Sequence, residues 1–140
     1  MMPPSSASPS DPQFLTVDDV VALHAGQLAR YGGAAGLRDG ALLESAVAQP
    51  QASFGGEWLH PDLWMMAAAY LFHLVQNHPF VDGNKRTGLL SALVFLSLNG
   101  IVLGQSTPAL YDLTIAVADG RLDKPAIAVA LRQLAADGGA

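Results

Sequence analysis

The sequence predicts an all-α fold of about six helices in one domain. Apolar runs of helical length recur along the 140 residues, and most of them end at glycine or proline. A hydrophobic content of 51% with 14% charged residues is enough to bury a core. There is no repeat period and no heptad run long enough for a coiled coil, so the helices are expected to form a compact bundle.

The first two helices are predicted from their capping residues. Thr16 and Asp19 form a capping-box-like start for a helix over residues 17–31, which two glycines then end. Asp39 is expected to cap a shorter helix that runs to about residue 49 and is followed by proline.

The middle of the chain predicts a flexible connection and then the central helix. Residues 53–57 contain two glycines and read as a mobile connection or a short hairpin. Residues 62–77 are almost entirely apolar, and a helix that is apolar on most sides belongs in the centre of a bundle. This helix must end near His78, because Pro79 disfavours the α conformation of the residue before it.

Three more helices are expected after this turn. Asn84 is the expected N-cap of a helix over residues 85–98, and Asn99-Gly100 is its expected left-handed stop. Further starts and stops predict helices over residues 107–118 and 123–136.

Residues 1–13 are rich in proline and serine and contain no lysine or arginine, which predicts a disordered tail rather than a signal peptide. The remaining residues, 14–140, are expected to form the single domain. The longest apolar run, residues 63–75, contains a histidine and is shorter than the ~20 residues that span a bilayer. No membrane segment is therefore expected.

Charge and cysteine content narrow the function. A net charge of −5 and a pI near 5.0 argue against broad binding of nucleic acid or of an anionic membrane. The absence of cysteine excludes a disulfide framework, a thiol nucleophile and a Cys-based zinc site. It also fits a protein of the reducing cytoplasm, which is the expected location.

Residues 78–88, with the sequence His-Pro-Phe-Val-Asp-Gly-Asn-Lys-Arg-Thr-Gly, carry the chemistry. Two of only seven basic residues, Lys85 and Arg86, stand side by side at a helix start, where backbone N–H groups already favour anions. Gly83 permits a positive φ, so the amides from Gly83 through Asn84 to Lys85 are expected to form an anion-binding nest for phosphates.

The same stretch offers a metal ligand and a base for phosphoryl or nucleotidyl transfer. Asp82 is its only carboxylate, and Mg²⁺ in such sites takes one or two protein carboxylates together with phosphate oxygens. His78 has an unperturbed pKa near ~6.5 and is the expected general base for a hydroxyl proton. No P-loop and no dinucleotide-binding glycine motif occurs elsewhere.

This stretch resembles the signature of the Fic fold, and more closely that of its Doc (death-on-curing) branch of toxins. Similar segments occur at residues 14–16, 36–39, 42–46, 54–57 and 96–100, so the resemblance covers nearly all of the chain after the tail. It implies a compact six-helix Fic/Doc bundle and a toxin of a type II toxin–antitoxin system.

The resemblance also suggests the reaction. Most Fic proteins move AMP from ATP to a protein hydroxyl and have glycine at the position of Lys85 and a second arginine at that of Leu89. The lysine is similar to that of Doc toxins, which are thought to transfer the γ-phosphate of ATP to a threonine of elongation factor Tu and so arrest translation.

By that similarity the residues take distinct roles. His78 is the base, Asp82 holds Mg²⁺, and the nucleotide phosphates are held by Gly83, Asn84, Lys85 and Arg86. Because Gly83 is common in AMP-transferring relatives, where the best-known Doc toxin has alanine, a protein adenylyltransferase stays the alternative. A non-catalytic Fic-fold binding module is the third hypothesis.

The implied partners are a protein substrate, similar to elongation factor Tu, and a small Phd-like antitoxin. Ser53 and Glu57 have the spacing of the inhibitory helix of self-restrained Fic proteins, but Trp58 and two glycines do not fit its pattern. Restraint is therefore expected from the C-terminal segment of a separate antitoxin, folding onto the toxin. No direct contact with nucleic acid or membrane is expected.

Other polar residues are given structural roles. His60, which precedes a proline, is expected to help cap a helix, and His73 is expected to be a hydrogen-bonded core histidine. Arg38 is expected to pair with Asp39 or Glu44. No spacing of histidines predicts a zinc site.

Overall fold

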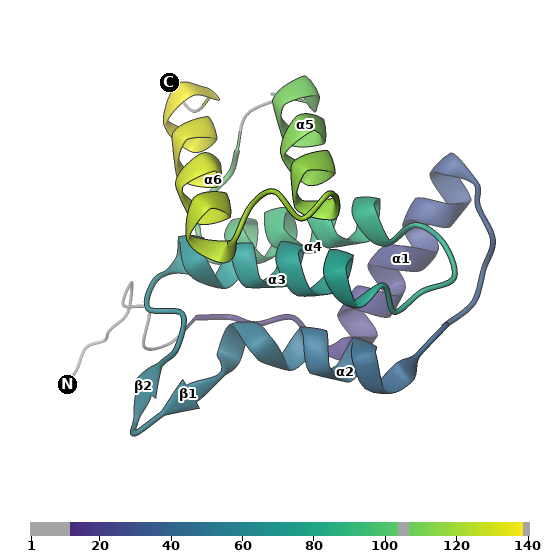
Figure 1. Cartoon of the computed structure of the whole chain (residues 1–140), viewed down its shortest axis with the longest axis horizontal. Helices are drawn as coiled ribbons and strands as arrows, with labels where there is room; N and C mark the ends of the chain where they lie inside the picture. Colours follow the sequence, from purple (N-terminus) through teal and green to yellow (C-terminus); the bar gives the residue numbers. More distant parts are fainter. Residues whose placement is uncertain (1–11, 104–106, 139–140) are drawn as a thin grey trace.

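The computed structural model describes residues 12–103 and 107–138, and it confirms an all-α fold with six helices in these ranges (Figure 1). In chain order the elements are α1 (Val17–Tyr31), α2 (Gly40–Ala48), the 3-10 turn η2 (Gln49–Gln51), β1 (Ser53–Phe54), β2 (Glu57–Trp58), α3 (Leu63–Asn77), α4 (Asn84–Leu98), α5 (Thr107–Ala118) and α6 (Lys124–Gly138). The expected tail over residues 1–13 lies outside the described residues except for its last two.

Helix α3 runs through the middle of the molecule and packs against α2, α4, α5 and α6 (Figure 1). Buried alanines at 67–69 keep this part of the helix narrow. Helix α4 approaches closely, since a Cβ added at Gly88 would lie 2.9 Å from Cγ2 of Val75. The small residues on both helices therefore allow two apolar rods to pack at short range.

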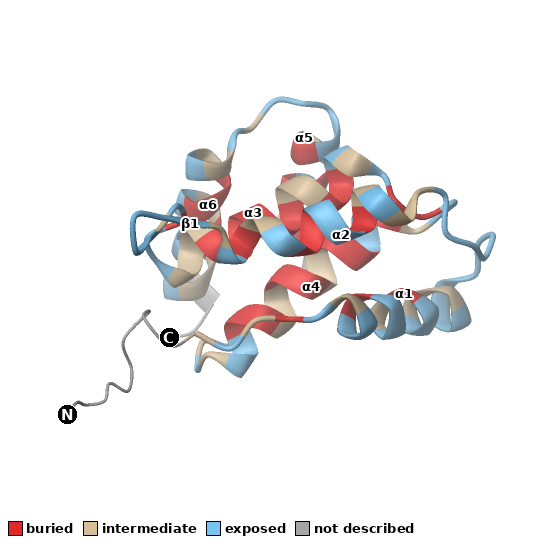
Figure 2. Cartoon of the chain, turned by 90° about the horizontal axis from the view of Figure 1, so that it is seen from below, coloured by how far each residue is buried: buried red, intermediate tan, exposed pale blue. Residues whose placement is uncertain are grey.

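Buried residues gather on α3 and on the sides of α2 and α4 that face it, whereas much of α1 is exposed (Figure 2). The hydroxyl of Tyr70, inside this core, accepts a hydrogen bond from the backbone N–H of Leu15 at 2.8 Å. Burial raises the pKa of Tyr70 to about 12. The start of the domain is thus fastened to the central helix.

The local capping signals give helix ends that agree with the structure. Thr16 and Asp19 form a complete capping box at α1, with hydrogen bonds of 2.8 and 3.1 Å. Asp39 accepts a hydrogen bond from the N–H of Leu42 at 3.0 Å and caps α2. Between η2 and α3 the glycine-rich connection is an antiparallel hairpin, one of the two expected alternatives.

One expected helix start is wrong, and the boundary of the expected tail lies one residue earlier than position 13. Gly83, and not Asn84, is the N-cap of α4, and Asn84 is the first residue of the helix. The left-handed stop expected at Asn99-Gly100 is present, since Gly100 has a φ of 90° and follows Asn99, the C-cap of α4. Gln13, expected in the tail, exchanges two hydrogen bonds with the Asn99 side chain at 2.8 and 3.0 Å.

His60 does not cap a helix. Asp62 caps α3 by accepting a hydrogen bond from the N–H of Met65 at 2.8 Å. His60 is buried, and the ammonium of Lys124 on α6 lies 3.1 Å from its Nε2 and 2.9 Å from Nε2 of His73. Lys124 thus joins α6 to α3, and His73 is hydrogen-bonded as expected.

Among the described residues, no helix has both the length and the apolar character needed to cross a lipid bilayer.

Candidate active site

The segment from His78 to Gly83 connects α3 to α4 and lies beside α1 (Figure 1). His78 ends α3 in the left-handed conformation, with φ 52° and ψ 53°. It is the one non-glycine residue with positive φ in residues 12–103 and 107–138. Because α continuation is disfavoured before Pro79, the chain leaves the helix here, and the His78 side chain is exposed on the wall of a cavity.

A strap formed by residues 34–39 runs antiparallel to this connection. Leu37 and Phe80 form an isolated β-bridge, and the N–H of Val81 donates to the carbonyl of Gly36 at 3.0 Å. The carbonyl of Pro79 accepts from two consecutive N–H groups of the strap, at 2.7 and 3.0 Å. The connection between α3 and α4 therefore has a defined backbone path despite its lack of helix or sheet.

Arg38 of the strap contacts the end of α3. Its Nε donates to the carbonyl of His78 at 2.6 Å, and its Nη2 donates to the carbonyl of Asn77 at 2.8 Å. The expected ion pair with Asp39 or Glu44 is absent, because the guanidinium is engaged by carbonyl groups that have no intrahelical partner at a helix end. The positive charge of Arg38 stays close to the His78 peptide.

The Asp82 carboxylate is held by backbone donors. Oδ1 accepts from the N–H of Gly83 at 2.9 Å, and Oδ2 accepts from the N–H of Ala34 at 3.2 Å. These two hydrogen bonds hold the pKa of Asp82 below its usual value, with smaller contributions from Arg86 and Lys85. The carboxylate is exposed and lies on the wall of the cavity described below.

His24 of α1 packs against the connection between α3 and α4. Its ring stacks on Phe80, with centroids 3.7 Å apart and planes 6° from parallel, and its Nε2 donates to the carbonyl of Asp82 at 2.8 Å. His24 is 5% exposed. The buried imidazole of His24 thus fixes the position of the backbone at Asp82 relative to α1.

The next two residues start α4. Gly83 has φ 80° and ψ 15°, which suits a left-handed N-cap. Asn84 is buried, and its side-chain amide both accepts from the N–H of Phe80 and donates to the carbonyl of Phe80, each at 2.9 Å. The Asn84 side chain therefore closes the turn of the connection, and its backbone amide belongs to the first turn of α4.

The two cations lie on that first turn. Lys85 and Arg86 are exposed, and the guanidinium of Arg86 lies 4.4 Å from the ring centroid of Tyr31 at the end of α1. The guanidinium of Arg30 lies 5.7 Å from the same ring. With Arg38, four of the seven basic residues of this acidic chain gather around the connection. They create a local positive field at the N-terminus of α4.

Lys85, Arg86 and Tyr31 lie on the wall of a cavity of about 990 Å³. Its polar end is lined by all six residues predicted as site residues: His78, Asp82, Gly83, Asn84, Lys85 and Arg86. Its other walls are mainly apolar and come from α4, α5 and the segment between them, including Leu89, Leu93, Val94, Val102, Leu103 and Leu110. The cavity therefore joins a polar end, which carries Lys85 and Arg86, to an apolar groove.

Sequence reasoning missed three residues of the site. His24 and Tyr31 share one face of α1 with Val20, and that periodicity pointed them toward the protein interior. Arg38 carried no local signal, because its partners lie about forty residues away in sequence.

Comparison with known proteins gives consistent results. The Fic/DOC family model matches residues 14–96. The protein kinase Doc of Escherichia phage P1 is 38% identical over 122 residues, which cover 87% of this chain and 95% of that protein. The toxin Doc of Mycolicibacterium smegmatis is 47% identical over 91 residues, 65% of this chain and 68% of that protein.

The chain therefore belongs to the Fic/DOC family. Its similarity to two Doc proteins places it in the Doc branch of that family.

Proposed function

We propose that this protein is a Doc-like toxin of a type II toxin–antitoxin system. It acts in the cytoplasm as a protein kinase that transfers the γ-phosphate of ATP to a serine or threonine hydroxyl of a translation factor similar to elongation factor Tu. The observation that carries the proposal is one cavity wall that combines an exposed imidazole, a carboxylate and the cationic N-terminus of α4. The names of the relatives, a toxin and a protein kinase, point the same way.

The residues divide the work of the transfer. His78 removes the proton of the attacking hydroxyl; the hydroxyl oxygen then forms a bond to the γ-phosphorus, and the bond from that phosphorus to ADP breaks. Lys85, Arg86 and the amides that begin α4 stabilise the charge on the phosphates. The left-handed backbone at His78 turns its imidazole out of α3 and onto the cavity wall.

The Asp82 carboxylate fits a magnesium ion. Each of its oxygens accepts one backbone hydrogen bond and keeps further lone pairs, and its lowered pKa leaves it charged at neutral pH. A single carboxylate together with phosphate oxygens and water is a usual environment for Mg²⁺. When bound there, Mg²⁺ would neutralise phosphate charge.

The adenylyltransferase alternative rests on Gly83. A Cβ added at Gly83 would meet Leu28 and His24 at 3.5 and 3.6 Å, which are ordinary contacts, so the position has space for alanine and favours glycine mainly for its φ of 80°. Gly83 is therefore weak support for AMP transfer. Lys85 on the cavity wall supports the kinase assignment, through the resemblance to Doc toxins.

A double-label experiment tests the assignment. The purified chain is incubated with a translation extract, Mg²⁺ and ATP that is labelled at either the α- or the γ-phosphate. Label from the γ-phosphate alone on a protein target is the expected result, whereas label from the α-phosphate would establish AMP transfer. His78→Ala should abolish labelling and growth arrest; arrest that persists in this variant would favour the binding module.

The apolar groove suits the proposed antitoxin. It continues directly from the phosphate-binding end and includes Val102, which is 73% exposed. A C-terminal antitoxin segment with an amphipathic helix would cover the apolar walls and close the polar end at the same time. One partner would then both bind and inhibit.

Co-expression tests this partner. A small protein from the adjacent reading frame should relieve growth arrest by the wild-type chain. Val102→Asp should weaken that relief while leaving arrest intact. Val129→Asp, at a 57% exposed position on α6 outside the cavity, is the matched control. Equal relief of both variants would contradict binding in the groove.

A further inference from the structure

We propose that Tyr31 is a positioning residue that holds the guanidinium of Arg86 toward the phosphates of the nucleotide. The inference rests on the proposed function, since it concerns how the same site binds ATP. The carrying observation is the distance of 4.4 Å between the Arg86 guanidinium carbon and the centroid of the Tyr31 ring, with both residues on the cavity wall.

Arg86 needs such a support because its position on α4 does not favour a cation. The first turn of a helix presents the positive end of the macrodipole, and the side chain of Arg86 is exposed. In residues 12–103 and 107–138, the one ion pair between side chains joins Arg121 and Asp119, so no carboxylate holds Arg86 there. An aromatic ring is then the group that limits its rotation.

A ring is also the right kind of support for a phosphate-binding arginine. A carboxylate partner would occupy the N–H donors of the guanidinium and cancel its charge. A cation–π contact uses the face of the guanidinium and leaves its five donors and its charge available to phosphate oxygens. Tyr31 therefore restrains Arg86 without competing with the ligand.

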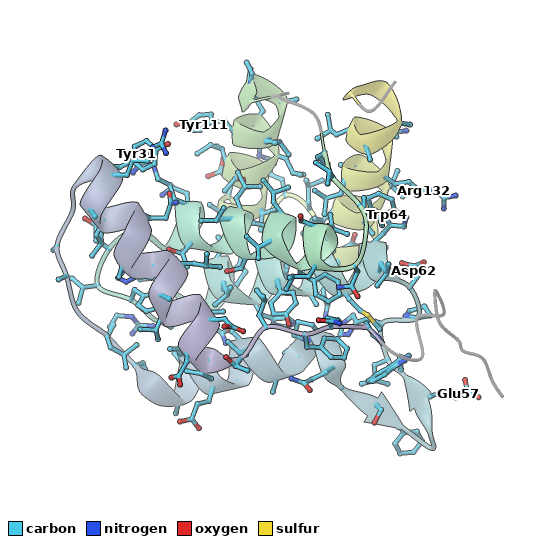
Figure 3. All side chains as sticks on the ribbon, turned by 180° about the vertical axis from the view of Figure 1, so that it is seen from behind. Tyr31, Glu57, Asp62, Trp64, Tyr111 and Arg132 are labelled. Carbon is cyan, nitrogen blue, oxygen red and sulfur yellow. The ribbon has the colours of Figure 1, made fainter. Side chains whose placement is uncertain are left out.

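The helix that carries Tyr31 is fixed at two places. Tyr31 is the last residue of α1, and the helix is closed directly behind it by a hydrogen bond of 2.8 Å from the N–H of Gly32 to the carbonyl of Leu28. About two turns further back in α1, His24 is hydrogen-bonded to the connection that precedes α4. Figure 3 shows Tyr31 at the end of α1, on the same side of the molecule as Tyr111 of α5, and both residues line the cavity.

If Tyr31 acts through a cation–π contact, its aromatic ring is required and its hydroxyl is not. Tyr31→Phe keeps the aromatic face and should bind ATP as the wild type does. Tyr31→Leu keeps an apolar side chain without the π face, and it should weaken ATP binding by about two- to five-fold, as expected for a cation–π contact at an exposed site. Because ATP binding is affected, the KM for ATP should rise more than kcat falls.

The experiment measures the Kd of Mg²⁺-ATP by calorimetry for the purified full-length chain. Tyr31→Leu is compared with wild type, with Tyr31→Phe and with Phe54→Leu, a control at an 82% exposed position on the hairpin. The same comparison in an Arg86→Ala background shows whether Tyr31 affects the Kd of ATP through Arg86. Tyr31→Leu should have no effect there if it acts through Arg86. Thermal unfolding of each variant excludes a general loss of structure.

The outcomes are distinct. A wild-type chain that does not bind ATP would overturn the proposed function and this inference with it. A wild-type chain that binds ATP, together with an unchanged Kd for Tyr31→Leu, would overturn the inference alone. A loss that persists in the Arg86→Ala background would show that Tyr31 contacts the nucleotide directly, and it would equally overturn a positioning role.

Discussion

Arg38 reaches from the strap to the backbone of His78 and donates to its carbonyl oxygen at 2.6 Å, while a second N–H of the same guanidinium binds the carbonyl of Asn77 at 2.8 Å. A planar fork is thereby matched to two successive carbonyls at the end of α3. The orientation of the proposed general base is set by a side chain forty positions earlier in the sequence.

Replacement of Arg38 tests this relationship. Arg38→Lys keeps the charge but cannot span both carbonyls in the same plane, so phosphate transfer should fall and the free energy of unfolding should drop by about 1 kcal/mol. Arg38→Ala should reduce both further. Urea unfolding and initial rates of transfer measure the two effects, and an Arg38→Lys variant with wild-type values would show that the fork is dispensable.

The left-handed backbone at His78 predicts that replacing this residue by glycine lowers activity without lowering stability. A non-glycine residue in the left-handed conformation costs about 1 kcal/mol, and glycine does not pay this cost. His78→Gly should therefore lose transfer activity and equal or exceed the wild type in unfolding free energy by up to about 0.5 kcal/mol, after the entropy of the unfolded glycine is subtracted. His78→Ala should lose activity without this gain. A His78→Gly protein that is clearly less stable than His78→Ala would refute the strain.

Gly33 leaves room for the Asp82 carboxylate. A Cβ at Gly33 would lie 2.9 Å from Oδ2 of Asp82, whereas a Cβ at Gly32 meets nothing within 4 Å. Both glycines have positive φ, so alanine is strained at either position, but only Gly33→Ala should displace the carboxylate. We expect Gly33→Ala to require about ten-fold more Mg²⁺ for half-maximal transfer. A Mg²⁺ titration compares it with Gly32→Ala, and equal requirements would argue against Asp82 as the ligand.

Asn84 distinguishes a structural from a ligand-binding amide. In Asn84→Asp the side chain loses the N–H that donates to the carbonyl of Phe80, in a buried position. The variant should unfold about 1–3 kcal/mol more easily, with the loss visible without any nucleotide. Chemical denaturation measures this cost. If the variant were as stable as wild type and deficient only in ATP binding, the amide would act on the nucleotide, as the sequence suggested.

The cluster of His60, His73 and Lys124 predicts a loss of stability in acid. Burial, with the Lys124 ammonium next in importance, lowers the pKa of His60, and the same causes lower that of His73 to about 4. Between pH 6.5 and about 4 the unfolded chain binds a proton at His73 that the folded chain does not, so stability falls as the pH falls through this range and is level above it. Thermal unfolding from pH 7.5 to 4 should show this slope.

His73→Gln supplies the control for this pH dependence. Glutamine can still accept a hydrogen bond from Lys124 but does not titrate. The difference in unfolding temperature between wild type and His73→Gln should therefore change between pH 6.5 and 4 and be constant above. A constant difference throughout would mean that other groups cause the acid sensitivity.

The sequence predicted the helices well because their ends are local events. Thr16 and Asp39 cap helices through bonds to residues three positions away, and such signals are readable in a short window. The residues proposed to bind phosphate are also neighbours in the sequence, so a single short motif contains all of them. Their shared cavity wall agrees with the prediction, whereas their individual roles stay predictions.

The errors concern residues whose partners are distant in sequence. Asn84 looked like a cap, but it binds the backbone of the preceding connection. His60 looked like a cap as well, and its partner is Lys124, sixty-four positions later. Arg38 had acidic neighbours in sequence and bound carbonyls instead. In each case a polar group satisfied its hydrogen bonds in the folded protein and not in its own segment.

The strap, residues 34–39, precedes by about seventy residues the part of α5 that lines the cavity. During translation, residues 34–39 are synthesised early. The residues of α5 that line the cavity, including Thr114, are synthesised much later. A growing chain therefore lacks part of the cavity until α5 has been synthesised. On the proposed function, a growing chain would therefore gain the ability to bind ATP only after α5 has been made.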